Sequence, residues 1–414
     1  MNNLLQKKHV LIITSLFYPE IGANSTRMTN LARRLVADGL KVTVVTAFPY
    51  YTSTIEKEFS KKMASHSNLE GIDIVRTWTF SAKKKNLFFR MLTFVSFMIS
   101  SAIYCSFSTK KYDVILSISP PFFSLITAMI VSVVRRVPYI IDVQDLYPDT
   151  AIQLGKLKNL FLINLWRTIE LMVYRHAAGI VVISHGFKRE IEAKGIEADK
   201  IAVIESWVDT TRFDSEKIVS QKTALGLQDK FIVLFLGNIG YAQRPDYIVK
   251  AAKLLRNDNN IIFLFIGDGV KKSSLINECL TSKLENITFL PPQPHEAVPS
   301  FIKAADVCLV HLAKTELYKI TIPSKTYEYM SMKKPIIMAV EGEAASLINR
   351  HKCGLVIEPE NPELLKEAIL TLVGDPEKRQ KIGERARVAA LLYSINQLTS
   401  KYRNIMETCI VSGR

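Results

Sequence analysis

The sequence predicts an α/β protein built from two doubly wound, Rossmann-like domains, on three observations. Short runs of β-branched and large aliphatic residues recur along the chain, with helical stretches between them. The runs are apolar throughout, which is typical of strands buried on both faces of a parallel sheet. They also fall into two series separated by a polar segment, 209–227, which we interpret as an interdomain linker.

Each series supplies enough strands for one sheet, and 414 residues suffice for two large domains. The first series comprises Val10–Thr14, Lys41–Thr46, Ile72–Thr77, Val114–Ile118, Tyr139–Val143 and Gly179–Ile183. The second comprises Phe231–Leu236, Ile261–Gly267, Ile287–Leu290, Val307–His311, Pro335–Ala339 and Gly354–Ile357. Each half opens with a strand, a glycine-containing loop and a helix. In the first half the loop contains Gly22 and the helix is Ser25–Ala37. In the second half the loop is 237–240 and the helix begins near Pro245. Because ligands bind beyond the carboxyl ends of such strands, we expect the site in the cleft between the domains.

Composition and charge narrow the classes of partner. Apolar residues make up 48% and charged residues 22%, which excludes a disordered chain, a collagen and a polytopic membrane protein. The net charge is +15, and residues 1–180 hold 22 basic against 11 acidic residues. A basic surface favours polyanions. This half has no zinc-ligand spacing and no basic-aromatic motif, so we expect it to bind no nucleic acid. Its basic runs, Lys83–Lys85 and Arg135–Arg136, adjoin apolar stretches, so we expect its partner to be an anionic membrane surface.

Cysteine usage and the apolar segments bear on the cellular compartment of the protein and on its relation to a membrane. Five widely spaced cysteines without a CxxC pair favour a reduced cytoplasm. The apolar run near the N-terminus precedes Pro19 and has no small-residue cleavage site, so we interpret it as a strand and not as a signal peptide. Leu87–Phe107 is apolar on nearly all sides and just long enough to span a bilayer, which leaves a transmembrane helix, a core helix and a membrane-surface helix open. Phe122–Val134 is too short to span and is interpreted as a crossover helix.

The most specific segment for chemistry is 322–330, Ile-Pro-Ser-Lys-Thr-Tyr-Glu-Tyr-Met. Proline and serine favour a helix start at Ser324, which would leave the N–H groups of Lys325 and Thr326 for an anion. Lys325 and Glu328 are three residues apart and share a helix face. A diphosphate would meet the ammonium group and the helix start, while Glu328 would accept two hydrogen bonds from a ribose diol. The alternative is an ordinary surface ion pair.

Several further motifs follow in order along the chain. With Pro323–Met330 and Lys334-Pro335, they are Phe17–Gly22 with Leu31-Ala32, Ser117–Pro121, Asp142–Asp149, Val182–Ser184, Leu236–Gly240 with Ala242-Gln243, and Glu341–Ala345. Together they resemble the family 4 glycosyltransferases of the two-Rossmann-domain (GT-B) type, and most closely the surface-polysaccharide branch with the O-antigen N-acetylfucosamine transferases. The resemblance extends from Val10 to about Ala390.

The resemblance implies roles for residues of the second half. Glu328 would bind the ribose of a nucleotide sugar, and Lys325, with Pro323, Ser324 and Thr326 at the helix start, its diphosphate. Gly237, Asn238 and Gly240 would form the loop that lets phosphates or sugar approach the backbone. The sequence departs from the family at Ile320, which replaces a carboxylate to the donor sugar, and in lacking the usual arginine and lysine after the glycine loop. Arg244 is a candidate replacement for one of them.

Three further residues of the second half are weaker candidates. Glu341 or Glu343 would replace the carboxylate lost at Ile320, although either also suits a solvated helix start. Gly267, in Gly-Asp-Gly, predicts a strand-to-helix turn near the nucleotide.

Acceptor-side candidates lie in the first half. Asp142 and Asp145 close the predicted strand Tyr139–Val143. We favour Asp145 to orient or deprotonate an acceptor hydroxyl, and the alternative is that one of the two caps a helix or loop. Asp149 is a candidate N-cap. Gly22 and His185 are placed at the cleft edge on the same side.

The predicted activity is retaining transfer of a sugar, N-acetylated and carried by UDP, to a polyprenyl-diphosphate-linked saccharide at the inner face of the plasma membrane. No cluster of histidines has metal-ligand spacing, so no metal or other cofactor is expected, and basic residues would stabilise the leaving diphosphate. The expected domains are 1–208 for the acceptor, 209–387 for the nucleotide sugar, and 388–414, which by resemblance crosses back onto the first domain. The alternatives are a nucleotide-sugar epimerase and a non-catalytic nucleotide-sugar-binding component of an assembly complex.

Overall fold

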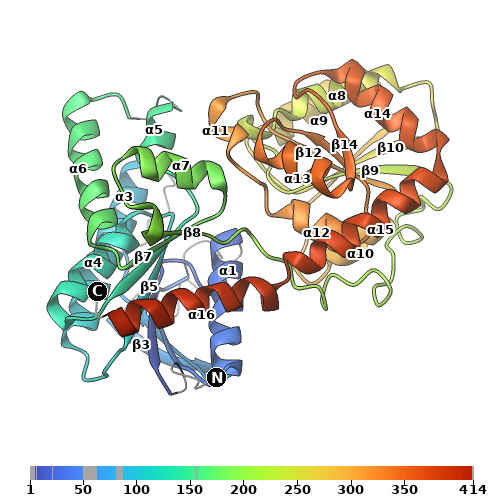
Figure 1. Ribbon diagram of the computed structural model, residues 1–414. Coiled ribbons are helices and arrows are strands. Elements are labelled where there is room, and N and C mark those ends of the chain that lie inside the picture. Colours follow the sequence, from blue (N-terminus) through green and yellow to red (C-terminus); the bar gives the residue numbers. More distant parts are fainter. Residues whose placement is uncertain are drawn as a thin grey trace. The chain divides into compact units, whose positions relative to one another are not determined.

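The computed structural model describes residue 5 and residues 7–20, 22–49, 63–80, 87–153, 155 and 157–412 (Figure 1). The chain forms two compact units, Met1–Glu205 with Leu398–Arg414, and Ser206–Gln397. The basic run Lys83–Lys85 lies outside the described residues, so its membrane contact stays a prediction.

The first unit is built on an eight-stranded sheet in the order β3-β4-β2-β1-β5-β6-β7-β8, parallel except at β3. Its strands are β1 His9–Ile13, β2 Lys41–Ala47, β3 Ala64–Leu69, β4 Ile72–Thr77, β5 Val114–Ser119, β6 Tyr139–Val143, β7 Gly179–Val182 and β8 Ile201–Val203. Its helices are α1 Ala23–Ala37, α3 Leu87–Phe107, α4 Phe123–Arg135, α5 Asp149–Gln153, α6 Leu160–His176, α7 His185–Ala193 and most of α16 Ile395–Ser412. The central strands are buried, as expected for a sheet with helices on both faces.

The second unit has a six-stranded parallel sheet in the order β11-β10-β9-β12-β13-β14. Its strands are β9 Phe231–Leu236, β10 Ile261–Ile266, β11 Ile287–Leu290, β12 Val307–His311, β13 Ile336–Ala339 and β14 Gly354–Val356. Its helices are α8 Pro245–Leu254, α9 Lys272–Thr281, α10 Val298–Ala304, α11 Glu316–Lys319, α12 Lys325–Ser331, α13 Glu343–His351, α14 Pro362–Gly374 and α15 Pro376–Leu392. Buried aromatic residues such as Phe235, Phe263 and Phe265 fill its core.

The predicted fold class is confirmed, and each predicted strand is present within a residue or two of its predicted bounds. Two strands were missed for physical reasons. β3 has the sequence Ala-Ser-His-Ser-Asn-Leu, which shows no apolar run because it is an exposed edge strand paired antiparallel to β4. β8 has only three residues.

The predicted linker is instead part of the second unit. Phe213 is buried, and its carbonyl accepts hydrogen bonds from Ser331 Oγ at 2.7 Å and from Arg387 Nη1 at 3.1 Å. Arg387 Nη1 also donates to the carbonyl of Thr210 at 3.3 Å. The segment lacks regular structure, and these hydrogen bonds hold it to the second unit.

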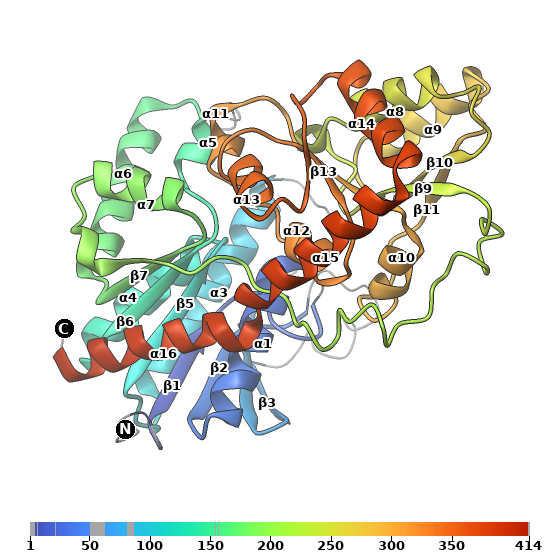
Figure 2. The same ribbon diagram turned by 45° about the vertical axis from the view of Figure 1, so that its right-hand side comes forward.

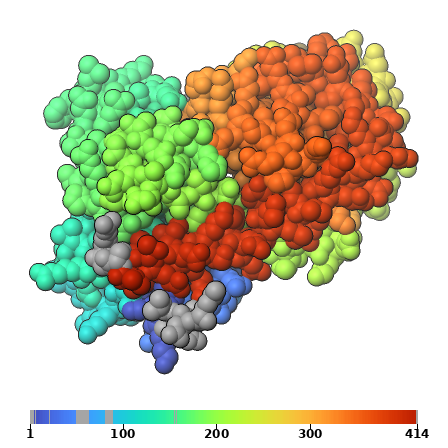
Figure 3. Space-filling model, viewed as in Figure 1, coloured from blue at the N-terminus to red at the C-terminus, as the bar shows by residue number. Residues whose placement is uncertain are grey.

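The chain returns to the first unit at Leu398, later than the predicted residue 388, because α15 packs within the second unit. α16 then lies on the first sheet, where Ile405 Cγ2 and Cys409 Sγ would meet a side chain added at Gly179, 3.0 and 3.4 Å away. The opposite side of α16 is exposed (Figure 3). Glycine at position 179 therefore allows this helix to approach β7.

α3 is a crossover helix between β4 and β5 that packs on the sheet and on α4. Over Phe89–Phe107 it is the one helix among the described residues that is long and apolar enough to cross a membrane, yet only 22% of that window is buried. The helix is thus partly a core helix, with a broad apolar side left in solvent.

Candidate functional site

An ammonium group lies at the carboxyl end of the central strand of the second sheet. Lys325 Nζ donates to the carbonyl oxygen of Leu236, 3.0 Å away, and lies 4.5 Å from the ring centre of Phe235. Leu236 ends β9 and precedes Gly237, where φ is 117° and a side chain would meet no atom within 4 Å. The fold thus brings Lys325 next to an open stretch of backbone, as an anion site beyond a parallel strand requires.

Lys325 and Glu328 both have perturbed pKa values, although part of each residue remains accessible. Burial of its charged group lowers the pKa of Lys325 to about 8, against the raising effect of Glu328. Burial raises the pKa of Glu328 to about 7, against the lowering effects of Arg212 and Lys325. Ionisable groups whose pKa values are shifted toward neutrality are typical of functional sites. In the described part of the chain the two form no direct ion pair, which disfavours the surface-pair alternative.

The start of α12 differs from the prediction at Thr326. The Thr326 N–H donates to the carbonyl of Pro323 at 3.0 Å, and the Thr326 side chain is fully buried. This residue therefore has neither a free amide nor an accessible hydroxyl for an anion, because Pro323–Thr326 closes as a turn before the helix. Ser324 is exposed and flanks the first helical residue, Lys325, so the Lys325 side chain is the group of this segment that reaches β9.

Sequence reasoning missed Arg212, whose charge acts on Glu328 from the segment interpreted as a linker. Arg212 Nη2 lies 2.8 Å from His295 Nδ1. A guanidinium group only donates, so Nδ1 accepts and the proton of the neutral ring is on Nε2. Burial and the charge of Arg212 lower the pKa of His295, which agrees with that state. No sequence signal marks Arg212, because its place depends on how an irregular segment packs.

Arg244 is occupied by carboxylates in this structure. Its Nη1 lies 2.9 Å from Glu360 Oε1 and its Nη2 3.2 Å from Asp246 Oδ2. Its guanidinium carbon lies 4.6 Å from the ring centre of Tyr247. Arg244 precedes α8 in the left-handed conformation, with φ of 43°, so its backbone turns the chain from the glycine loop into the helix. Its role toward a nucleotide sugar stays a prediction.

His311, at the end of β12, joins the same loops. Its Nδ1 lies 2.9 Å from the carbonyl oxygen of Gln243, and its Nε2 accepts from the Glu360 N–H at 3.1 Å. These partners fix the neutral form with the proton on Nδ1, since a carbonyl only accepts and an amide N–H only donates. Burial lowers the pKa of His311 to about 4. A buried neutral histidine therefore holds the segment that follows the glycine loop.

We expect His311 to make stability depend on pH between about 6.5 and 4. In this window the unfolded chain protonates the residue and the folded chain does not, so stability falls as pH falls, by up to about 3 kcal/mol from this group. His311→Asn keeps a donor near Nδ1 but cannot titrate. Denaturant unfolding of both proteins across this range should show a smaller loss for the variant. Equal losses would contradict the assignment.

The loop after β13 lies beside Ile320, where the resemblance predicts a carboxylate. A side chain added at Gly342 would lie 1.9 Å from the carbonyl oxygen of Lys319, the neighbour of Ile320, and φ at Gly342 is 75°. Glu341, just before this glycine, is 3.6 Å from Lys319 Nζ. Glu343 begins α13. Close backbone packing thus brings the loop that holds the two glutamates to Lys319, beside Ile320, and the role of either glutamate toward a sugar stays a prediction.

Gly267 has a packing role that its sequence did not reveal. A side chain there would lie 1.9 Å from the carbonyl oxygen of Gly237, and φ is 146°. The loops after β9 and β10 are further joined by the Ile239 N–H, which donates to the Asp268 carbonyl at 2.8 Å. At Gly240 an added side chain would instead meet Asn238 Nδ2 at 2.7 Å, and Asn238 Nδ2 itself donates to Gln243 Oε1 at 3.2 Å. The glycine loop is therefore held in one conformation by its neighbours.

In the first unit, Asp142 is a structural residue. It is 0% exposed, its Oδ2 accepts from Arg27 Nε at 2.8 Å and from the Tyr402 hydroxyl, and its Oδ1 accepts from Gln144. Arg27 also donates to the carbonyl of Ile204 at 3.0 Å. The acceptor-side prediction for Asp142 is therefore corrected, since both oxygens are engaged in joining α1, β6 and α16.

The other acceptor-side candidates stay accessible. Asp145 is half-buried, and its Oδ1 accepts from Thr150 Oγ1 at 2.5 Å. Gly22 precedes α1 with φ of 152° and has no atom within 4 Å of an added side chain. His185 is the exposed first residue of α7. Asp149 is the first residue of α5 and is bound by Lys194 at 2.7 Å, so it was wrongly expected as the residue preceding that helix.

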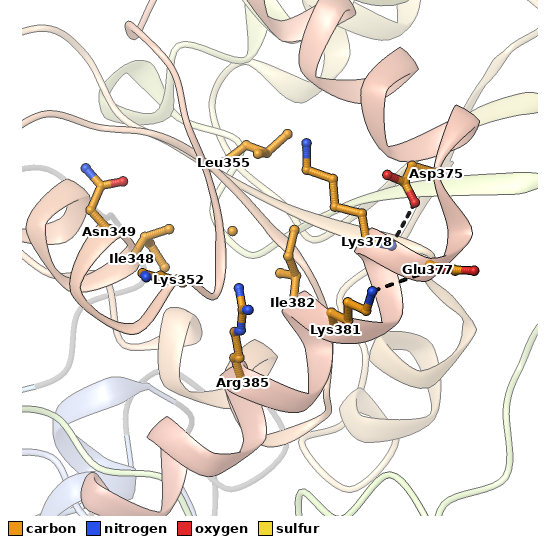
Figure 4. A pocket seen from close by; sticks show the side chains of 11 residues that line it. Ile348, Asn349, Lys352, Leu355, Asp375, Glu377, Lys378, Lys381, Ile382 and Arg385 are labelled. Atoms are coloured by element: carbon orange, nitrogen blue, oxygen red, sulfur yellow. Dashed lines mark hydrogen bonds and ion pairs between the residues drawn. The ribbon is translucent and has the colours of Figure 1, made fainter.

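A hollow of about 440 Å³ lies elsewhere on the second unit. The cations Lys352, Lys378 and Arg385 surround an apolar floor there (Figure 4). It opens where α13 passes into β14, which is the amino edge of a parallel sheet, away from Lys325. Among the described residues, no group of three or more histidine, cysteine or acidic side chains could hold a metal ion.

Comparison with known families agrees with this geometry. The family "Glycosyl transferase 4-like domain" matches residues 22–207, and the family "Glycosyl transferases group 1" matches residues 219–389. The putative colanic acid biosynthesis glycosyl transferase WcaI of Escherichia coli is 24% identical over 371 residues, which cover 87% of this chain and 91% of that protein.

Solved structures share the fold at low sequence identity. Sucrose-phosphate synthase of Thermosynechococcus elongatus aligns with a TM-score of 0.76 and 14% identity over 98% of this chain and 100% of that one. HepE of Anabaena, solved in complex with UDP, aligns with a TM-score of 0.71 and 14% identity over 97% and 99%. Each half of the chain thus matches a glycosyltransferase family, and the whole chain shares its fold with solved structures.

Proposed function

Because the chain belongs to the family 4 glycosyltransferases and has the GT-B fold, we propose that it transfers a sugar during surface-polysaccharide synthesis. The sugar is N-acetylated and carried by UDP. The acceptor is a hydroxyl of a polyprenyl-diphosphate-linked saccharide. The observation that carries the donor class is the Lys325 ammonium group, 3.0 Å from the Leu236 carbonyl at the open backbone of Gly237, with Glu328 one turn further along α12. The crystal structure of HepE in complex with UDP supports the choice of nucleotide. We assign acceptor binding to residues 1–208 and donor binding to 209–387. The segment expected to cross back, 388–414, does so from Leu398.

The proposed chemistry needs two kinds of group from this chain. Lys325 stabilises the charge that develops on the diphosphate as its bond to the anomeric carbon breaks. Glu328 holds the ribose diol as a carboxylate. The acceptor oxygen bonds to the anomeric carbon on the face that the diphosphate leaves, and its proton passes to a diphosphate oxygen, so the configuration is retained. Asp145 positions the acceptor hydroxyl, and Glu343 contacts the sugar beside Ile320.

The acceptor class and the charge distribution support a peripheral position of the enzyme on the cytoplasmic face of the plasma membrane. The surplus of basic residues falls on residues 1–180, with 22 basic against 11 acidic residues. An N-acetylfucosamine-type donor is the specific expectation from the motifs shared with that branch.

A panel assay tests the proposal. Purified protein is given several UDP-sugars, GDP- and dTDP-sugars for comparison, and a short polyprenyl-diphosphate N-acetylglucosamine, and the lipid product is analysed by mass spectrometry. We expect one sugar to be added from a UDP donor, with the anomeric configuration kept. Conversion of the UDP-sugar without any acceptor would favour the epimerase, and no addition from any donor would overturn the transfer proposed here.

A further inference from the structure

Three helices of the first unit form one layer, which we call the α3–α4–α6 face. α3 leads from β4 to β5, α4 from β5 to β6 and α6 from β6 to β7, all in the same direction along the sheet. Right-handed crossovers in one direction place their helices on one face of a parallel sheet, and α3 packs on α4, which packs on α6 (Figure 2). α1 leads in the opposite direction, from β1 to β2, and therefore covers the other face.

α3 divides into a buried side and an exposed apolar side. The buried side has residues four apart, Thr93, Phe97, Ser101 and Cys105, which face the sheet. The exposed side has large apolar residues at helical spacing, Leu92, Ile99, Ile103 and Phe107, whose exposed fractions rise from 37% to 84%. A helix with one face in the protein core and a second apolar face in solvent indicates an interaction surface.

The neighbouring helices continue this apolar surface. α4 exposes Ile130, Val133 and Val134, next to the end of α3, where Arg135 Nη1 donates to the Ser106 carbonyl at 3.3 Å. α6 exposes Leu160, Phe161, Leu162, Leu165 and Met172, the first two at 75% each. Leaving this many large apolar side chains in water is costly, at about 25 cal/mol per Å² of apolar surface.

The charges on and around the same helices favour a lipid bilayer over a protein as the partner of this face. The three helices contain one acidic residue, Glu170, which is buried and paired with Lys194 at 2.6 Å. Exposed cations stand at or just beyond the helix ends, namely Arg90, Lys111, Arg136, Lys158 and Arg175. The three helices themselves carry no exposed carboxylate, although α7, which continues the layer beside α6, exposes Glu190. An apolar centre flanked mainly by cations complements an anionic bilayer, whose headgroups attract each Lys or Arg by about 1 kcal/mol.

We propose that the α3–α4–α6 face seats on an anionic lipid bilayer, with the three helices lying in the plane of its surface. α3 does not cross the bilayer, because its Phe97 side packs on the sheet. Membrane binding by this face does not depend on the proposed function, but its purpose, delivery of a lipid-linked acceptor, rests on that function. Trp166 of α6 packs against Tyr147, with ring centres 5.2 Å apart, two residues after Asp145. A lipid-borne acceptor entering beside the start of α6 therefore arrives at the edge of the sheet where Asp145 lies.

The first test measures vesicle binding by flotation. The full-length protein should bind vesicles of phosphatidylcholine with 30% phosphatidylglycerol, and bind at least tenfold less in 0.5 M salt or without the anionic lipid. Phe161→Ser with Leu165→Ser should lower binding at least tenfold, as should Ile99→Ser with Ile103→Ser. The matched control is Val270→Ser with Leu280→Ser, which removes residues exposed by 74% and 71% in the second unit and should leave binding unchanged.

The second test locates the contact. The five natural cysteines are buried, so a polarity-sensitive dye attached to Phe161→Cys or to the control Val270→Cys reports on one site. We expect a blue shift with anionic vesicles at residue 161 and none at residue 270. The proposal is overturned if the serine variants bind vesicles as well as the wild type, or if the dye at residue 161 shows no shift. It is also overturned if the wild type forms a stable dimer that the same substitutions dissociate. UDP binding in lipid-free solution is measured in parallel, so that failure of the donor site is seen separately.

Discussion

Replacing Lys325 with methionine should lower kcat/KM for sugar transfer by about 10²- to 10³-fold. The methionine keeps the volume over the Phe235 ring but removes the ammonium group that lies 3.0 Å from Leu236 O. Loss of one preorganised charge that stabilises a leaving group costs about 3–4 kcal/mol in the transition state. Steady-state kinetics with the lipid acceptor measures the effect.

The same pair of residues predicts a pH profile for UDP binding. Glu328 must be ionised to accept from the ribose, and its pKa is about 7, while Lys325 must be charged, and its pKa is about 8. Affinity in the free enzyme should therefore decline below pH 7 and above pH 8. Lys325→Met should lose the alkaline limb and move the acidic limb to higher pH, because the Lys325 charge lowers the pKa of Glu328.

Lys333→Ala provides a matched control for these experiments. Lys333 follows α12 and binds the exposed Glu216 at 2.6 Å, so its removal takes one cation from the same unit. We expect kcat/KM and UDP affinity to stay within about twofold of wild type. Wild-type activity of Lys325→Met, or an equal loss in Lys333→Ala, would remove Lys325 from the proposed site.

Asp142→Ala should destabilise the protein by about 3–5 kcal/mol, because it leaves the guanidinium of Arg27, 6% exposed, buried without its carboxylate. Tyr402 of α16 loses the same acceptor. Chemical denaturation measures the loss, and limited proteolysis should cut the C-terminal helix earlier in the variant. Replacing both partners, as Arg27→Met with Asp142→Leu, should restore much of the stability, since no buried charge remains.

The exposed pair Arg33–Glu70 serves as the control for this prediction. Its atoms are 2.9 Å apart, but its side chains are 40% and 59% exposed. Glu70→Ala should therefore cost less than about 1 kcal/mol. A similar small cost for Asp142→Ala would show that the buried network is not what holds α16.

Part of the site could be predicted because its residues are neighbours in the sequence. Lys325 and Glu328 share a helix face by spacing alone, and Gly237 follows a strand that is apolar throughout. The acceptor-side residues show the limit of this reasoning. Asp142 and Asp145 look alike in sequence, yet Asp142 is 0% exposed and bound by Arg27 and Tyr402, which are distant in the chain.

By itself, the sequence determined the two parallel sheets, nearly all of their strands and the segment that carries Lys325, because apolar runs and helix spacing are local properties. Only the tertiary structure decided that Arg212 acts on Glu328, that His311 is neutral and that Thr326 is closed off. It also decided which side of α3 is exposed. Burial and hydrogen-bond partners are set by contacts between distant segments, and no local pattern encodes them.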